Sequence, residues 1–247
     1  MKILLTNDDG FDAKGLTCMR DMLVSLGHKV LVVAPDRNCS ASSHSLTLRS
    51  AIIFKKINDN LVVVQGTPVD CVYLALNGLL DYTPDLVISG INEGENLGDD
   101  VIYSGTLAAA TEARLAGVPA LAISLAGSKN FITAALIVER LLKEKIYLNY
   151  NLWNINVPDV EYKNIKGIKL TKQGFRNIRA RDKINIYKLR NESGFWVNKP
   201  SAPEAKFLTV DYDFGAVLAK FVSITPISID HTMKDFSFLS GMDCLIS

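Results

Sequence analysis

Histidine and cysteine are scarce in this sequence, and neither residue type is spaced as zinc sites require. The 247 residues include only three histidines and four cysteines. Cys18, Cys39, Cys71 and Cys244 stand far apart and match no CxxC or mixed Cys/His spacing. This pattern argues against a structural zinc site and favours reduced thiols.

Long hydrophobic runs and an excess of either charge are also absent. A membrane-spanning helix needs roughly 18 consecutive apolar residues, and no stretch of the chain approaches that length. Asp8 and Asp9 interrupt the amino terminus before a signal-peptide core forms, so we expect a cytoplasmic protein. With 27 basic and 26 acidic side chains, the formal charge of +1 attracts neither a nucleic-acid polymer nor an anionic membrane.

Two catalytic signatures are missing from the first turn of the chain. The segment after the first apolar run reads NDDG and lacks the GxGxxG glycines that let a backbone approach a dinucleotide pyrophosphate. Its two aspartates are adjacent, whereas phosphatases of the haloacid dehalogenase type use a DxD pair. These absences argue against a dehydrogenase and against that phosphatase class.

Apolar runs that alternate with helical patterns are present over most of the chain. Strand patterns occupy Ile3–Leu5, His28–Pro35, Leu61–Gln65, Asp85–Ser89, Ala120–Leu125 and Leu152–Val157. Helical patterns lie between them at about 13–26, 68–80, 106–116 and 131–145. This alternation predicts parallel βαβ units, and therefore an α/β fold with a Rossmann-like three-layer αβα core around a mainly parallel sheet.

The pattern changes after residue 168. The short pieces IKLTKQ, INIYKL, FWVN and FVSITPIS are separated by Gly, Asn, Asp and Pro, which predicts hairpins rather than further βα units. Residues 230–247 predict a short terminal helix. We therefore expect a C-terminal β-hairpin and helix extension.

Oxygen-bearing side chains follow three of the predicted strands. Asp8 and Asp9 follow the first, Ser40 lies in a hydroxyl-rich loop after the second, and Asn92 and Asn96 follow the fourth. Adjacent carboxylates repel each other unless a cation or hydrogen bonds offset their charge. The set suits magnesium, manganese or calcium. The alternative is that Asp9 belongs to a turn and Asp8 caps a helix.

A possible phosphate site lies at the start of the helix near residue 106. Ser104, Gly105 and Thr106 would place free amide groups and the positive end of the helix dipole at its first turn. Ordinary capping by Ser104 or Thr106 is the alternative. A cation beside such a terminus suggests phosphate-ester hydrolysis, with Asp8 or Asp9 orienting or deprotonating water. Direct water attack and a covalent aspartyl-phosphate both remain open.

Several ordered motifs of the chain resemble one family. They are TNDDG, APDRN followed by Ser40, GTPVDCVYLALN, SGIN, the NxGxN of residues 92–96, LGDDVIYSGT and NINVPD. Together they resemble the SurE family, the survival-protein-E 5′-nucleotidases. The resemblance extends from Met1 to about Gly174, with a weaker similarity at FVSITPIS.

The resemblance implies a divalent-metal-dependent phosphatase of nucleoside 5′-monophosphates, in which some members also take 3′-nucleotides or short polyphosphate. Asp8, Asp9, Ser40 and Asn92 match the family's ligands for one metal ion per subunit. Asn96 and the turn 104–106 match its phosphate-side residues. The implied organisation is one domain over 1–247, with a metal and nucleotide core to about 175. The extension over about 176–247 would build a homodimer or homotetramer.

Two residues depart from the family pattern in the loop after the second strand. Ala41 stands where the family usually has glycine, and His44 stands where asparagine is common. Ala41 would restrict the loop if the glycine uses a positive φ. The alternative to an enzyme is a non-catalytic module that binds metal and nucleotides in stress responses.

Overall fold

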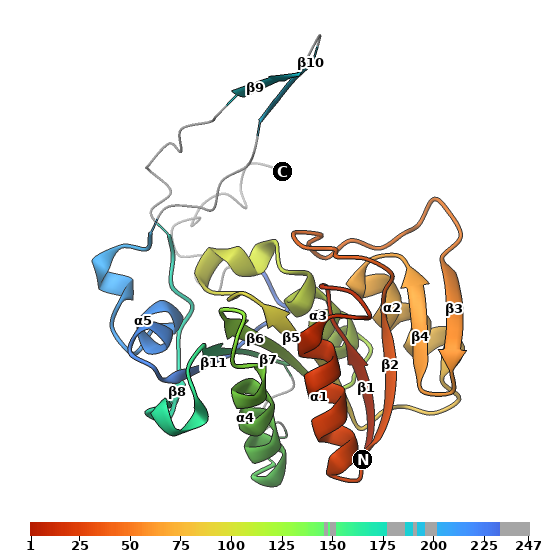
Figure 1. Cartoon of the computed structure of the whole chain (residues 1–247), viewed down its shortest axis with the longest axis horizontal. Helices are drawn as coiled ribbons and strands as arrows, with labels where there is room; N and C mark the ends of the chain where they lie inside the picture. Colours follow the sequence, from red (N-terminus) through yellow and green to blue (C-terminus); the bar gives the residue numbers. More distant parts are fainter. Residues whose placement is uncertain (146–147, 149–151, 177–185, 190–191, 196–201, 233–247) are drawn as a thin grey trace, which may run out of the picture.

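One mixed sheet of nine strands organises the protein. The computed structural model describes residues 1–145, 148, 152–176, 186–189, 192–195 and 202–232. The strand order across the sheet is β3-β4-β2-β1-β5-β6-β7-β11-β8 (Figure 1). The strands are β1 (Lys2–Thr6), β2 (Lys29–Pro35), β3 (Ile53–Asn58), β4 (Leu61–Gln65), β5 (Leu86–Glu93), β6 (Ala120–Ala126), β7 (Leu152–Pro158), β8 (Ile168–Leu170) and β11 (Val222–Pro226).

The centre of the sheet is parallel, as the alternating pattern predicted. Neighbours from β4 through β2, β1, β5 and β6 to β7 all pair in parallel. The chain moves outward from β1 to β2 and β4, and then returns to place β5 on the other side of β1. The strand order therefore reverses between β1 and β5. In open α/β sheets, ligands bind at the carboxyl edge of such a switch point.

Helices cover both faces of this sheet and complete the three layers. Helices α1 (Lys14–Ser25) and α4 (Phe131–Lys143) cover one face, and α2 (Pro68–Leu74) and α3 (Gly105–Leu115) cover the other (Figure 1). Successive β1 side chains point to opposite faces. Ile3 and Leu5 pack under α1 and α4, whereas Leu4 packs under α2 and α3.

Helix α1 lies unusually close to the switch point. A Cβ atom on Gly15 would stand 2.0 Å from the carbonyl oxygen of Ile91 in β5. Only glycine permits this approach, because no side chain can occupy that space. The close packing holds the start of α1 beside the ends of β1 and β5.

The region after residue 168 differs in part from the hairpins that its sequence predicted. Strands β9 (Ile186–Leu189) and β10 (Glu192–Phe195) do pair as an antiparallel hairpin. However, β11 pairs antiparallel with β7 and parallel with β8, so these two strands extend the main sheet. The paired residues of β8 and β11 lie more than fifty positions apart in the chain, and turn motifs predict pairing only between strands that are neighbours in the sequence. The predicted terminal helix falls mostly on residues 233–247, outside the described residues.

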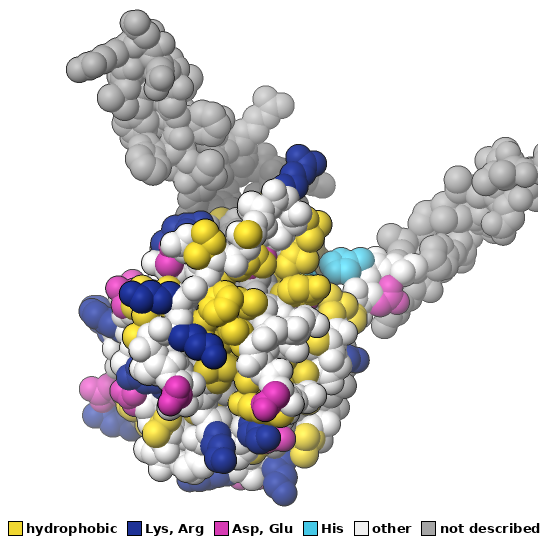
Figure 2. All heavy atoms as spheres, turned by 90° about the vertical axis from the view of Figure 1, so that its right-hand side faces the viewer, with side chains coloured by type: hydrophobic (Ala, Val, Ile, Leu, Met, Phe, Trp, Pro, Cys, Tyr) yellow, Lys and Arg dark blue, Asp and Glu magenta, His cyan; other side chains and the backbone are white. Residues whose placement is uncertain are grey.

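One helix and one edge strand are among the elements that the sequence patterns missed. Helix α5 (Asp213–Leu218) precedes β11, and β3 forms an edge strand antiparallel to β4. All six β3 residues are exposed, so the strand has no buried face to produce an alternating pattern. Figure 2 shows the side of the molecule that carries β3, with hydrophobic and basic side chains intermingled. Ile53, Phe54 and Ile57 are the exposed apolar residues of this strand.

Two sequence-based expectations concern the whole chain. Among the described helices, none is long and apolar enough to cross a membrane. Cys18, Cys39 and Cys71 form no disulfide bond among the described residues. Cys244 lies outside the described residues.

Candidate functional site

The turn after β1 places two acids at the switch point of the sheet. The side-chain amide of Asn7 donates to the carbonyl oxygen of Gly10 over 2.8 Å and closes the turn. Gly10 has a φ of 110°, a conformation that a residue with a Cβ rarely adopts. The backbone N–H of Cys39 donates to the carbonyl oxygen of Asp8 over 2.7 Å. This bond joins the β1 turn to the loop that carries Ser40.

Asp8 points at the amino terminus of α3. Its side chain is only 4% exposed, and Oδ1 accepts a 2.6 Å hydrogen bond from the hydroxyl of Thr106. A Cβ on Gly105 would stand 2.9 Å from Asp8 Oδ2, so the carboxylate lies directly against the first helical turn. The structure therefore brings Asp8, Gly105 and Thr106 together, although about 97 residues of chain separate them.

Asp9 faces an open cleft instead of the helix. Its Oδ2 accepts a 2.9 Å hydrogen bond from the backbone N–H of Glu93 at the end of β5. Asp9, Ser40 and Glu93 all line this cleft, whose volume is about 410 Å³. Ser40 is exposed, and its hydroxyl donates to Asn38 Oδ1 over 2.6 Å.

Asn92 is the penultimate residue of β5, and Asn96 lies three residues beyond the end of that strand. The register of β5 against β6 shifts between Ser89 and Asn92, an irregularity that changes where the following side chains point. The Asn92 amide nitrogen donates to the carbonyl oxygen of Gly94 over 2.8 Å. Deeper in the protein, the Asn96 amide nitrogen donates to Ser124 Oγ at 2.8 Å and Thr106 Oγ1 at 3.4 Å. Thr106 thus connects Asn96 to Asp8.

The local environment disfavours ionisation of both carboxyl groups. Burial raises the pKa of Asp8 above its ordinary value, and the hydrogen bond from Thr106 only partly opposes this increase. Burial raises the pKa of Asp9 to about 6; the N–H of Glu93 opposes the increase, and the charges of Asp8 and Glu93 add to it. None of the largest contributions to either pKa comes from a cationic side chain of the described residues. A bound cation would offset this charge.

The donor set fits a hard cation and not zinc. The described residues contain no group of three or more His, Cys, Asp or Glu side chains arranged to hold a metal. Two carboxylates beside serine and asparagine oxygens are instead the kind of ligands that magnesium, manganese and calcium prefer. Asn7 Oδ1 and Ser42 Oγ are buried at this site without a hydrogen-bond partner in the described residues. Such unsatisfied oxygens fit a site that binds a ligand.

The side chain of Ser104 has a structural role. Its hydroxyl accepts a 3.0 Å hydrogen bond from the backbone N–H of Leu107, which caps α3. This is the capping that the sequence left open as an alternative. His44 Nε2 lies 2.9 Å from a carboxylate oxygen of Glu112 in α3. This contact connects the loop to α3, and it directs the imidazole to Glu112 instead of to Asp8 and Asp9.

Sequence reasoning missed Ser42 and Glu93 as site residues. A Cβ on Gly105 would meet Ser42 Oγ at 2.8 Å, so this hydroxyl lies against the α3 terminus. The hydroxyl-rich composition of its loop indicated function, but could not identify which serine turns inward. Glu93 contributes its backbone N–H, which donates to Asp9, and a pattern of side chains cannot predict a contact made by the backbone.

A doubly wound α/β protein with acids and a helix amino terminus at its switch point belongs to the class that binds ions or phosphorylated ligands there. The comparisons with known proteins identify the family within this class. A family model described as survival protein SurE matches residues 3–180. The chain belongs to the SurE family.

Full-length relatives and a solved structure agree with this assignment. A 5′-nucleotidase SurE of Marinomonas sp. (strain MWYL1) is 48% identical over 235 residues, covering 94% of this chain and 93% of the relative. A 5′/3′-nucleotidase SurE of Yersinia enterocolitica is 44% identical over 236 residues, which cover 94% of this chain and 93% of the relative. The crystal structure of the SurE protein from Aquifex aeolicus superposes with a TM-score of 0.81 at 37% identity, covering 97% of this chain and 100% of that one.

Proposed function

We propose that this protein is a divalent-metal-dependent 5′-nucleotidase that hydrolyses nucleoside 5′-monophosphates to nucleoside and phosphate. The observation that carries the proposal is the contact between Asp8 and the amino terminus of α3, where a carboxylate that could hold a cation meets amide groups that could hold phosphate. The nucleotidase names of the full-length relatives support the same reaction. The name of the Yersinia protein also supports a side activity on 3′-nucleotides, and we extend the proposal to short polyphosphate.

We assign one metal ion per subunit to the oxygens of Asp8, Asp9, Ser40 and Asn92, with magnesium or manganese as the physiological ion. When bound, the cation supplies Lewis-acid polarisation of a phosphoryl oxygen and lowers the pKa of a water ligand. Asp8 is the more buried of the two acids, and Thr106 fixes one of its oxygens. Its role is therefore to hold the cation in one position.

Asp9 lines the cleft and accepts the proton of the attacking water. Its Oδ2 is held by the N–H of Glu93, so the carboxyl group keeps a fixed orientation toward the open side of the site. Asn96 and the turn Ser104-Gly105-Thr106 bind the phosphate side of the substrate. The amide groups of the first turn of α3 and its dipole stabilise the negative charge that accumulates there.

We propose further that the chain is one domain with a core to about residue 175 and an extension over about 176–247 that assembles a homodimer or homotetramer. The hairpin β9–β10 lies in this extension (Figure 1). We propose nucleoside monophosphates as substrates, and the near balance of acidic and basic residues supports the view that neither a nucleic-acid polymer nor a membrane is a partner.

Metal removal tests the proposed reaction. Phosphate release from AMP and GMP should stop after EDTA treatment and desalting, and should return when magnesium or manganese is added. Full activity after rigorous chelation would contradict the metal requirement. Tight AMP binding without phosphate release under any divalent metal would instead support a non-catalytic nucleotide-binding module.

A further inference from the structure

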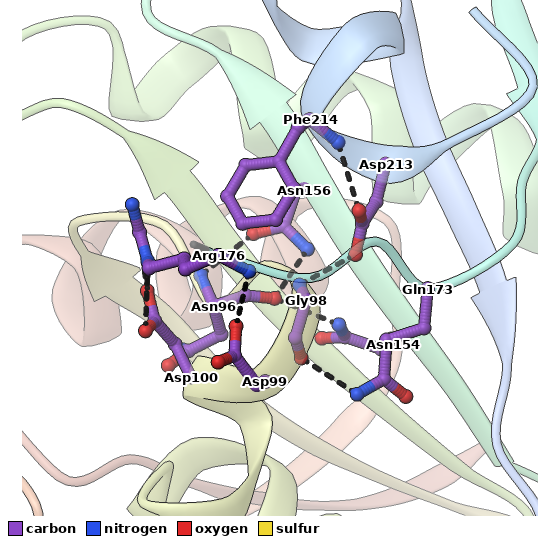
Figure 3. Close-up of polar contacts among 10 residues, drawn as sticks. All are labelled: Asn96, Gly98, Asp99, Asp100, Asn154, Asn156, Gln173, Arg176, Asp213 and Phe214. Atoms are coloured by element: carbon purple, nitrogen blue, oxygen red, sulfur yellow. Dashed lines mark hydrogen bonds and ion pairs between the residues drawn. The ribbon is translucent and has the colours of Figure 1, made fainter. Parts of the chain in front are cut away.

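The segment Asn96–Asp100 carries a residue of the proposed phosphate site and leads into α3. Its first residue is held by two asparagines of β7 (Figure 3). The Asn96 N–H donates to Asn156 Oδ1 over 2.8 Å, and the Asn96 carbonyl oxygen accepts from Asn156 Nδ2 at 3.0 Å and Asn154 Nδ2 at 2.8 Å. Both polar groups of the Asn96 backbone are therefore fixed from the sheet.

The next part of the segment is held by residues more than seventy positions further along the chain. Asp213, at the start of α5, is fully buried, and its Oδ2 accepts a 2.7 Å hydrogen bond from the Gly98 N–H. Its Oδ1 accepts from the backbone N–H groups of Gly174 and Phe214 at 2.9 and 2.8 Å. On the other side of the peptide, the Gln173 amide donates to the Gly98 carbonyl oxygen over 2.7 Å.

Arg176 holds the end of the segment. Its guanidinium donates to both carboxylate oxygens of Asp100, through Nε at 3.0 Å and through Nη2 at 2.5 Å. Its backbone N–H donates to Asp99 Oδ1 over 3.0 Å. The guanidinium also lies 5.0 Å from the centre of the Phe214 ring, in the range of a cation–π contact. A bidentate pair of this kind constrains orientation as well as distance.

Steric contact reinforces these hydrogen bonds. Gly98 has a φ of 55°, and a Cβ at this position would stand 2.4 Å from the Phe214 ring. The segment is thus enclosed by β7 on one side and by residues 173–176 and α5 on the other. A displacement of this segment would move Asn96 and the beginning of α3 together, because a few residues connect them.

We propose that Asp213 and Arg176 are positioning residues, which hold Asn96–Asp100 so that the Asn96 side chain and the α3 terminus meet the Asp8 carboxylate correctly. This inference rests on the proposed nucleotidase function. Neither residue contacts Asp8, Asp9, Ser40 or Asn92 in the interactions described above, so neither is a candidate metal ligand. Their loss should therefore change turnover more than metal affinity.

Replacing the buried acid by its amide tests the proposal. Asp213→Asn keeps the shape, but places an amide nitrogen against a backbone N–H donor and so loosens the segment. Displacements of about 1 Å can cost roughly 100-fold in rate, and we expect kcat for AMP to fall roughly 10- to 100-fold. The Kd for Mn²⁺, measured by titration calorimetry, should stay within about twofold. Hydrogen exchange at the amides of residues 96–100 should accelerate at least tenfold.

Asp159→Asn is the matched control. The Asp159 carboxylate also accepts backbone N–H bonds, from Ser128, Lys129 and Asn130, but it holds a loop that carries no proposed site residue. This variant should keep kcat within about twofold of the wild type. If Asp213→Asn also keeps its kcat while exchange at 96–100 accelerates, the network only stabilises the fold and the proposal fails.

Arg176 gives a second variant pair in case Asp213→Asn does not fold. Arg176→Gln removes the charge and should lower kcat about tenfold, whereas Arg176→Lys keeps the charge and should recover part of that loss. Equal kcat values for the wild type and both variants would overturn the inference. A wild-type protein that releases no phosphate would instead overturn the proposed function, which separates the two failures.

Discussion

At the scale of single residues, Asp8 is a buried carboxyl group whose charged form is unfavourable in the folded protein but is needed for the proposed reaction. Its carboxyl group is buried beside Asp9, and its pKa is raised because burial disfavours the charged form. Thr106 and the first turn of α3 compensate only part of this cost. Asp8 therefore resembles many catalytic acids, which are held in places that are unfavourable for their own charge.

Asp8→Asn tests this view through the response to metal. The change keeps the shape of the side chain and removes a ligand charge. Mutation of a residue that only hydrogen-bonds to a metal ligand already lowers metal affinity or activity about 10- to 100-fold. Loss of the ligand charge itself should therefore lower the rate of phosphate release roughly 100-fold or more. Thermal unfolding with and without Mn²⁺ is the measurement. At 100 times its Kd, the ion should stabilise the wild type by about 2.7 kcal/mol and stabilise the variant far less. Equal metal-induced shifts would show that Asp8 is not a ligand.

Ala41 gives the second prediction at this scale. Its φ is 60°, so the loop adopts the positive-φ backbone conformation that glycine, the usual family residue at this position, accommodates without strain. For alanine, this conformation costs about 1 kcal/mol, which corresponds to roughly a fivefold change in population. Ala41→Gly should therefore raise kcat/KM for AMP by up to about fivefold. Ala41→Val should lower kcat/KM, because a β-branched residue tolerates positive φ poorly. An Ala41→Val protein with undiminished kcat/KM would contradict this reasoning.

At the scale of secondary-structure elements, the site depends on how closely α3 approaches the β1 turn. Small residues at the start of α3 allow this approach, and Gly105 is the point of closest contact. A Cβ there would meet Asp8 Cβ at 2.8 Å as well as the Ser42 hydroxyl. The helix therefore places its amino terminus at the carboxylate only if residue 105 has no side chain.

Gly105→Ala should separate α3 from Asp8 by several tenths of an ångström and lower kcat roughly 10-fold, because the amide groups lose their alignment and a displacement of about 1 Å can cost roughly 100-fold. Gly78→Ala is the matched control. Its new Cβ would meet only the flexible end of Leu74 at 3.5 Å, so activity should be unchanged. Steady-state assays on AMP compare the two proteins, and circular dichroism checks that both are folded. A fully active Gly105→Ala protein would disprove the close-contact argument.

The elements that sequence patterns predicted best are those with a buried face. The apolar run before Asp8 identified β1 and the acids at its end, because a strand covered on both faces needs consecutive apolar residues. The exposed β3 and the short α5 carry no such periodicity and were missed. Asn156 and Asp213 were missed for another reason. They contact Asn96 and Gly98 across 60 and 115 residues of chain, and only the sheet order brings them together.

At the scale of the whole molecule, one position shows where the proposed assembly region leaves the core. Arg176 and Pro203 form an isolated antiparallel bridge, so the chain departs from the core and returns to it at the same place. Arg176 also belongs to the cluster that holds Asn96–Asp100. We therefore expect that removal of residues 177–202 does not displace the segments that build the site.

Replacement of residues 177–202 by a short Gly-Ser linker tests the proposal that this extension drives assembly. The ends are already paired, so a short loop closes at little entropic cost and the fold should remain. We expect light scattering after size exclusion to give a dimer or tetramer for the full chain and a smaller assembly for the variant. Phosphate release per chain should remain within about threefold, since Asp213 and Arg176 are both retained. An unchanged oligomer would exclude residues 177–202 as the interface. Loss of phosphate release from a folded, smaller assembly would show instead that the site depends on contact between subunits.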